Sequence, residues 1–131
     1  YSIDQAKVFH QLAPNMPMSI GLGTDADIES FDNSGIPDQL VIAWTGTKLL
    51  PASHYQKLHA RGWRVIVGTL GNSPNSIDNQ ILNTKSAYIY TDIVKRGADV
   101  IATDRFWAVQ QEVVNPNILV YSKPSIAIQP N

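Results

Sequence analysis

The chain has 131 residues, enough for one domain at most, and 44% of them are hydrophobic, enough to fill a core. The 10 Lys and Arg against 11 Asp and Glu give a net charge of -1, which excludes a basic nucleic-acid-binding domain and an acidic disordered tail. There is no Cys for a disulfide or a thiolate metal site, and no apolar run approaches the ~20 residues that span a bilayer. A chain without Cys folds equally well in the cytosol and the periplasm, so the compartment stays open.

The N-terminal part of the chain alternates helix and strand patterns. Residues Ile3–Leu12 place apolar side chains near helical spacing, and Met18–Leu22 is a short apolar run that predicts a buried strand. Asp25–Phe31 predicts a short helix, which the turn residues Asp32–Gly35 end. The second strand is predicted over Leu40–Trp44.

The same alternation continues toward the C-terminus. Pro51 and Gly62 bound a predicted helix over Ser53–Ala60, because Pro favours a helix start and Gly a helix end. The remaining predicted elements are a strand over Arg64–Gly68, a helix over Ser76–Lys95, a strand over Asp99–Ala102 and a helix over Arg105–Val114.

This α-β-α-β-α-β-α-β-α order predicts an α/β fold of parallel βα units with right-handed crossovers. None of the four strand patterns alternates apolar with polar residues, which is typical of strands buried on both faces. Two architectures fit: a small open α/β sandwich, and half of a TIM (β/α)8 barrel, which needs ~250 residues when whole. A lone half-barrel exposes two strand edges and an apolar face, so it needs its missing half or a second copy of itself.

The two ends of the sequence indicate how the domain is organised. Residues Tyr1–Asp4 include no initiator Met and no signal peptide, so we expect residues 1–131 to be a single partial domain excised from something longer. The tail over residues 117–131 contains a short apolar run and two prolines, which predicts an extra strand or an extended arm.

Two segments carry a resemblance to a known family. Lys95–Phe106 resembles the closing segment of glycerophosphodiester phosphodiesterases, in which a Gly and an Asp open the last barrel strand and a Thr-Asp pair ends it. Leu58–Asn72 is similar to that family's preceding helix, Gly, strand and Thr-containing loop. Leu12–Leu22 agrees more loosely, and the likeness spans roughly Gln5 to Gln111.

The resemblance implies that the chain is the C-terminal half of a barrel whose whole enzyme hydrolyses glycerophosphodiesters to an alcohol and glycerol phosphate. In that family a His-Arg pair, a later His and carboxylates that hold a divalent cation, Mg or Ca, lie on the first half of the barrel. This chain has no His-Arg pair, and its only Glu residues, Glu29 and Glu112, lie outside any such metal motif. We therefore expect no catalytic or metal-binding residue here and no activity from the chain alone.

The rim at the strand ends is the expected pocket wall, because ligands of parallel α/β folds bind at the C-terminal ends of strands. It is rich in hydroxyls and small residues, which suits a glycerophosphodiester-type small molecule. The candidate wall residues are Trp44, Thr45, Thr69, Asn72, Thr103 and Asp104. Asp104 has two interpretations, a pocket group or the N-cap of the helix after it, and we favour the cap.

Two other sequence patterns give weaker indications of function. Gly21–Ala26 matches the dinucleotide pattern G-x-G-x-x-A, but Asp25 and Asp27 would repel a pyrophosphate, so we interpret it as a turn. His54 and His59 do not share a helix face, and we expect both at the surface or the helix flank. The alternative function is a non-catalytic α/β binding module or a half-barrel homodimer.

Overall fold

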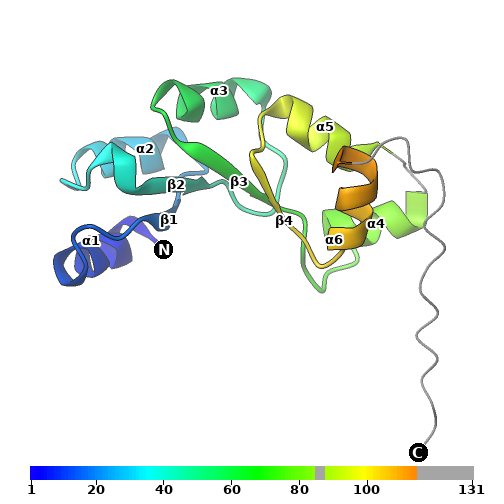
Figure 1. Cartoon of the computed structure of the whole chain (residues 1–131), viewed down its shortest axis with the longest axis horizontal. Coiled ribbons are helices and arrows are strands. Elements are labelled where there is room, and N and C mark those ends of the chain that lie inside the picture. The colour runs from blue at the N-terminus through cyan, green and yellow to red at the C-terminus, as the bar shows by residue number, and fades with distance from the viewer. Residues whose placement is uncertain (85–87, 115–131) are drawn as a thin grey trace, which may run out of the picture.

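The computed structural model of the chain describes residues 1–84 and 88–114. Helices and strands alternate along it with four strands in one sheet (Figure 1). The elements are α1 Ile3–Leu12, β1 Met18–Gly21, α2 Asp25–Asp32, η1 Asp38–Leu40, β2 Val41–Trp44, α3 Ala52–Ala60, β3 Arg64–Gly68, α4 Ile77–Thr84, α5 Ile89–Arg96, β4 Val100–Ala102, α6 Phe106–Val109 and the π-helical turn η2 Gln110–Val114. The predicted tail over residues 117–131 lies outside the described residues.

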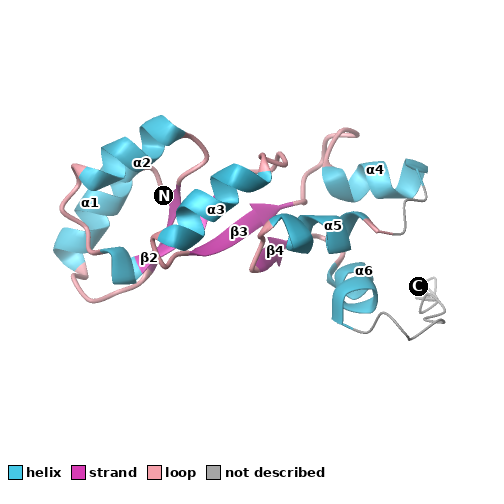
Figure 2. Cartoon of the chain, turned by 90° about the horizontal axis from the view of Figure 1, so that it is seen from above, coloured by secondary structure: helices cyan, strands magenta, loops and turns pink. Residues whose placement is uncertain are grey.

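The sheet is parallel throughout, and its strand order β1-β2-β3-β4 follows the sequence. When parallel strands are ordered as in the sequence, right-handed crossovers place all the connecting helices on the same face of the sheet. In a doubly wound sandwich the strand order reverses once, and the helices therefore cover both faces of the sheet. Figure 1 shows α2, α3 and α5 together above the strands, and Figure 2 shows the same arrangement from above. The predicted α/β class is confirmed, and the order excludes the open sandwich.

Burial alternates along β1 and β2, so the expectation that both faces of these strands are buried is wrong for this chain. In β1 and β2, Ile20 and Ala43 are fully buried under the helices, while their neighbours Ile42 and Trp44 are only half-buried. In β4, Val100 is 44% exposed. The physical reason is that α2, α3 and α5 lie together over one face of the sheet. The other face keeps apolar side chains, as the inner face of the expected half-barrel would.

The predicted helix over Ser76–Lys95 is two helices, α4 and α5. The backbone breaks at Tyr88, whose φ of -130° and ψ of 13° are not helical. The Tyr90 hydroxyl donates to Asp78 Oδ1 at 2.8 Å, although residues 12 apart on one straight helix would lie ~18 Å apart along its axis. The apolar spacing continues through the break, so the pattern alone indicated a single helix.

The short helix α2 is confirmed and starts with a capping box. The Asp27 N–H donates to Thr24 Oγ1 at 3.1 Å, and the Thr24 N–H donates to Asp27 Oδ2 at 2.8 Å. These reciprocal bonds satisfy two N–H groups at the helix start. The Gly21–Ala26 segment is therefore a strand followed by a capped helix, and an aspartate occupies the place at which a pyrophosphate would bind.

Candidate functional site

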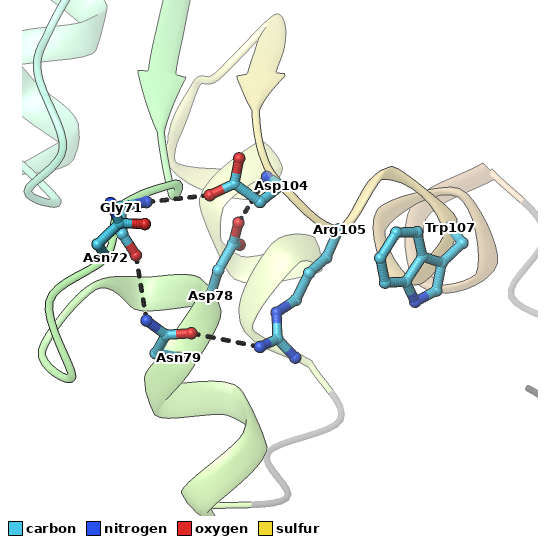
Figure 3. Close-up of a pocket in the computed structure, with 7 residues that line it drawn as sticks. All are labelled: Gly71, Asn72, Asp78, Asn79, Asp104, Arg105 and Trp107. Carbon is cyan, nitrogen blue, oxygen red and sulfur yellow. Dashed lines mark hydrogen bonds between the residues drawn. The ribbon is translucent and has the colours of Figure 1, made fainter. Parts of the chain in front are cut away.

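The C-terminal ends of β3 and β4 meet at a cavity of about 550 Å³ (Figure 3). The loop after β3, the start of α4 and the segment from β4 into α6 contribute its lining. The lining residues are Gly71, Asn72, Asp78, Asn79, Asp104, Arg105 and Trp107. The cavity lies where parallel α/β folds bind their ligands, and it combines two carboxylates, two amides, a guanidinium and an indole.

Asp78 is the buried centre of this site, with 1% of its surface exposed. Its Oδ1 accepts the Tyr90 hydroxyl at 2.8 Å, and its Oδ2 accepts the Thr103 hydroxyl at 2.8 Å and the Asp104 N–H at 2.9 Å. The carboxylate thereby joins α4 and α5 to the end of β4. No motif in the sequence indicated this role, because these donors come together only in the folded chain.

The charge on Asp78 is stabilised by its donors. Burial by itself would raise the pKa of Asp78, but hydrogen bonds from Thr103, Thr69 and Tyr90 and from the Asp104 N–H outweigh it and lower that pKa. Burial, and then the same carboxylate, raise the pKa of Tyr90. The site therefore contains a fixed negative charge and a phenol that stays protonated.

Asp104 lies at the cavity and accepts the Gly71 N–H at 3.2 Å. It makes no cap for the following helix, because α6 has Arg105 at its N-cap position and no side-chain cap bond. The favoured cap interpretation of Asp104 is therefore wrong. Thr103 supplies the local turn instead, since its hydroxyl accepts the Arg105 N–H at 2.9 Å.

Arg105 and Asn79 form the polar side of the cavity. Arg105 Nη2 donates to Asn79 Oδ1 at 3.3 Å, and Asn79 Nδ2 donates to the carbonyls of Gly71 at 3.1 Å and Ser73 at 2.9 Å. The Asn79 amide thus ties the loop after β3 to α4 and orients the guanidinium (Figure 3). A guanidinium oriented in this way can donate to phosphate oxygens.

The other candidate wall residues lie at the C-terminal ends of β2 and β3, with Trp44 the last residue of β2, Thr45 just after it and Thr69 just after β3. Thr45 is 5% exposed and donates to the Ile66 carbonyl at 3.1 Å, and the fully buried Thr69 lies 3.2 Å from the Ala102 carbonyl. Trp44 lies over Gly68: a Cβ added there would be 2.6 Å from Trp44 Cη2. Of the six candidates, Asn72 and Asp104 line the cavity, and Thr103 supports it through Asp78.

A second hollow of about 300 Å³ lies beside the start of α3. His54 Nε2 donates to the Leu22 carbonyl at 2.8 Å and the side chain is 10% exposed, so the prediction of a surface position is wrong for His54. Its Nδ1 lies 3.8 Å from Asp25 Oδ1. Lys57 Nζ donates to Asp25 Oδ1 at 2.8 Å, and this hydrogen bond makes the largest contribution to lowering the pKa of Asp25.

Within residues 1–84 and 88–114 no group of three or more His, Asp or Glu side chains could hold a metal ion. In the cavity, both oxygens of Asp78 accept hydrogen bonds from protein donors. Glu112 accepts the Thr91 N–H at 2.9 Å and so caps α5. In the part of the chain that is described, no helix is long and apolar enough to cross a membrane.

Comparison with known proteins gives one informative likeness. No protein-family model matches the sequence, and no curated protein matches it. The structure resembles that of a glycerophosphoryl diester phosphodiesterase from Parabacteroides distasonis, with a TM-score of 0.70 and 22% sequence identity. The likeness covers 94% of this chain and 42% of that one, so the chain spans less than half the length of the protein it resembles. The chain therefore has the fold of a partial TIM barrel, with four parallel strands that alternate with helices.

Proposed function

We propose that the chain is part of a glycerophosphodiester phosphodiesterase-like hydrolase and forms one wall of its substrate pocket. The observation that carries this proposal is the cavity at the ends of β3 and β4, in a fold similar to that of a solved phosphodiesterase. The segment that resembles the family's closing strand, with Thr103 and Asp104, leads directly into this cavity.

The proposed roles follow from the chemistry of the wall. Arg105 donates hydrogen bonds to the non-bridging phosphate oxygens, while Asn72 and Asp104 bind the glycerol hydroxyls, one through its amide and the other through its carboxylate. Asp78 positions Thr103 and the Asp104 backbone and does not touch the substrate. Trp44 and Thr45 extend the wall along β2, and Thr69 holds β3 against β4.

The reaction of the whole protein needs groups from outside this chain. Water attacks the phosphorus, a phosphorus–oxygen ester bond breaks, and a proton passes to the departing alcohol, which leaves glycerol phosphate. The acid-base groups, and the divalent cation that the resemblance implies, belong to the other part of the barrel, because the described residues offer no ligand set for a cation.

The test is hydrolysis of glycerophosphocholine by the full-length coding product that contains residues 1–131, with Mg or Ca present. Arg105→Ala is expected to lower kcat/KM by ~10-fold or more, because it removes a charged donor from the phosphate. The matched control is Arg96→Ala, which removes an exposed partner of Asp92 at the end of α5. Equal activities of the two variants, or no hydrolysis by the full-length product, would contradict the proposal.

The second candidate function is a non-catalytic binding module, favoured by one observation: the cavity brings the Arg105 guanidinium, the Asn72 amide and the Asp104 carboxylate together within this chain. The same experiment separates the two functions if glycerol 3-phosphate binding is measured in parallel. Saturable binding that Arg105→Ala weakens, with no turnover in the full-length product, supports the binding module.

A further inference from the structure

Trp107 lines the cavity, and the phosphate and glycerol contacts proposed above make no use of it. It lies with Asp104 and Arg105 on the segment that leads from β4 into α6, and it is 54% exposed. Figure 3 shows its indole beyond Arg105, on the side away from Asp78 and Asn79. A ligand that passes Arg105 in that direction therefore meets an aromatic ring.

The irregular start of α6 lets Trp107 and Arg105 line the same cavity. Side chains two residues apart on a regular helix do not face each other, but Arg105 is the N-cap residue and has a non-helical φ of -127° and ψ of 51°. Phe106 meets Trp107 edge to face, with ring centroids 5.2 Å apart and an interplanar angle of 81°. Such a contact uses at most one face of the indole, so the other face can receive a ligand.

The charges of the lining favour a ligand that carries a positive group. The lining has two carboxylates, Asp78 and Asp104, against the single guanidinium of Arg105. A phosphodiester brings a further negative charge into the same space. A positive group on the far side of the phosphate offsets that charge, and a low-dielectric wall strengthens its attraction to the carboxylates.

We propose that Trp107 is a specificity-determining residue whose indole face holds a quaternary ammonium group on the alcohol part of the substrate, as in an ester of choline. This inference rests on the proposed function, which places the phosphate at Arg105. A trimethylammonium group has no N–H and cannot donate a hydrogen bond to a carboxylate, so an aromatic face is its best partner. A primary ammonium group is strongly hydrated and donates hydrogen bonds, so it gains less from the ring.

The test compares glycerophosphocholine with glycerophosphoethanolamine as substrates of the full-length product that contains residues 1–131, with Mg or Ca present. Trp107→Leu is expected to lower the ratio of the two kcat/KM values by ~3-fold or more, and Trp107→Phe is expected to lower it less. The matched control is Tyr88→Leu, which removes an aromatic side chain that is 76% exposed and lies outside the cavity lining. This control is expected to leave the ratio unchanged.

Two results would overturn the proposal. In the first, Trp107→Leu lowers both kcat/KM values by the same factor, as a purely structural role would. In the second, the choline to ethanolamine ratio stays unchanged while hydrolysis of glycerophosphoinositol falls, which would mean that the indole stacks on a sugar ring.

Calorimetric binding of the same two compounds to the full-length product separates this inference from the proposed function, because binding needs no turnover. Tighter binding of glycerophosphocholine that Trp107→Leu abolishes, in a product that hydrolyses neither compound, supports the inference and contradicts the proposed function. Hydrolysis with the same ratio in the wild type and in Trp107→Leu contradicts the inference alone.

Discussion

At the scale of single residues, the site depends most on Asp78. This side chain is buried, charged and bonded to groups from three separate segments, including Tyr90 and Thr103. Asn72 and Asp104 could be placed at the rim from their positions after predicted strands, because strand ends of a parallel sheet meet at one edge. Asp78 could not be placed in the site from the sequence. A carboxylate in the first turn of a helix is usually exposed, and the helix dipole alone is enough to favour it there.

The first prediction concerns the stability that Asp78 supplies. Asp78→Asn is expected to lower the free energy of unfolding by about 2–4 kcal/mol, because an amide NH₂ would face groups that donate hydrogen bonds. Urea unfolding of the purified chain measures this. Asp4→Asn, at a side chain that is 96% exposed, is the control and is expected to change stability by less than ~0.5 kcal/mol. Two variants of equal stability would show that the Asp78 network contributes nothing.

The second prediction concerns pH. Because the folded pKa of Asp78 lies below its unfolded value of 3.8, the unfolded state binds more protons between the two values. The contribution of Asp78 is therefore fully present above the unfolded pKa and is lost as the pH falls through the folded pKa. Urea unfolding midpoints should show that the wild type is more stable than Asp78→Asn at neutral pH and that this difference shrinks below about pH 4. A difference that stays constant down to about pH 2 contradicts this assignment.

At the scale of elements, local patterns placed most helices and strands but missed a break. All four predicted strands are present within two residues of their expected bounds, because short apolar runs between turn residues have few other interpretations. The break between α4 and α5 was missed because apolar spacing continues through it. The Tyr90–Asp78 hydrogen bond, which requires the break, joins residues from both helices and leaves no local signal.

The third prediction concerns the packing of β2 on β3. Gly68→Ala is expected to destabilise the chain by about 1–3 kcal/mol, because the new Cβ would lie 2.6 Å from Trp44 Cη2 and 3.0 Å from Thr47 Cγ2. Trp44→Leu should relieve most of that cost, which a double-mutant cycle of unfolding free energies measures. Gly21→Ala is the matched control, since its nearest contact is an ordinary 3.5 Å. Additive effects of the Gly68 and Trp44 changes would contradict the proposed contact.

At the scale of the whole molecule, the chain is a sheet covered on one face. The strand order and the helices account for the buried side, and the other side keeps half-exposed apolar residues such as Ile42 and Ile66. The alternation of helices and strands in the sequence predicted the parallel sheet. The strand order seen in the structure was needed to choose between the open sandwich and the half-barrel. The cavity at the ends of β3 and β4 lies at the edge of the sheet where parallel α/β folds bind their ligands.

The most direct test of whether this chain lacks the catalytic groups is an assay of the purified 131-residue chain with glycerophosphocholine and either Mg or Ca. We expect no hydrolysis above the buffer rate, because residues 1–84 and 88–114 contain no group of three or more side chains that could hold a metal ion. Far-ultraviolet circular dichroism of the same sample verifies that the assayed chain is folded. Metal-dependent turnover by the folded chain alone would contradict the account.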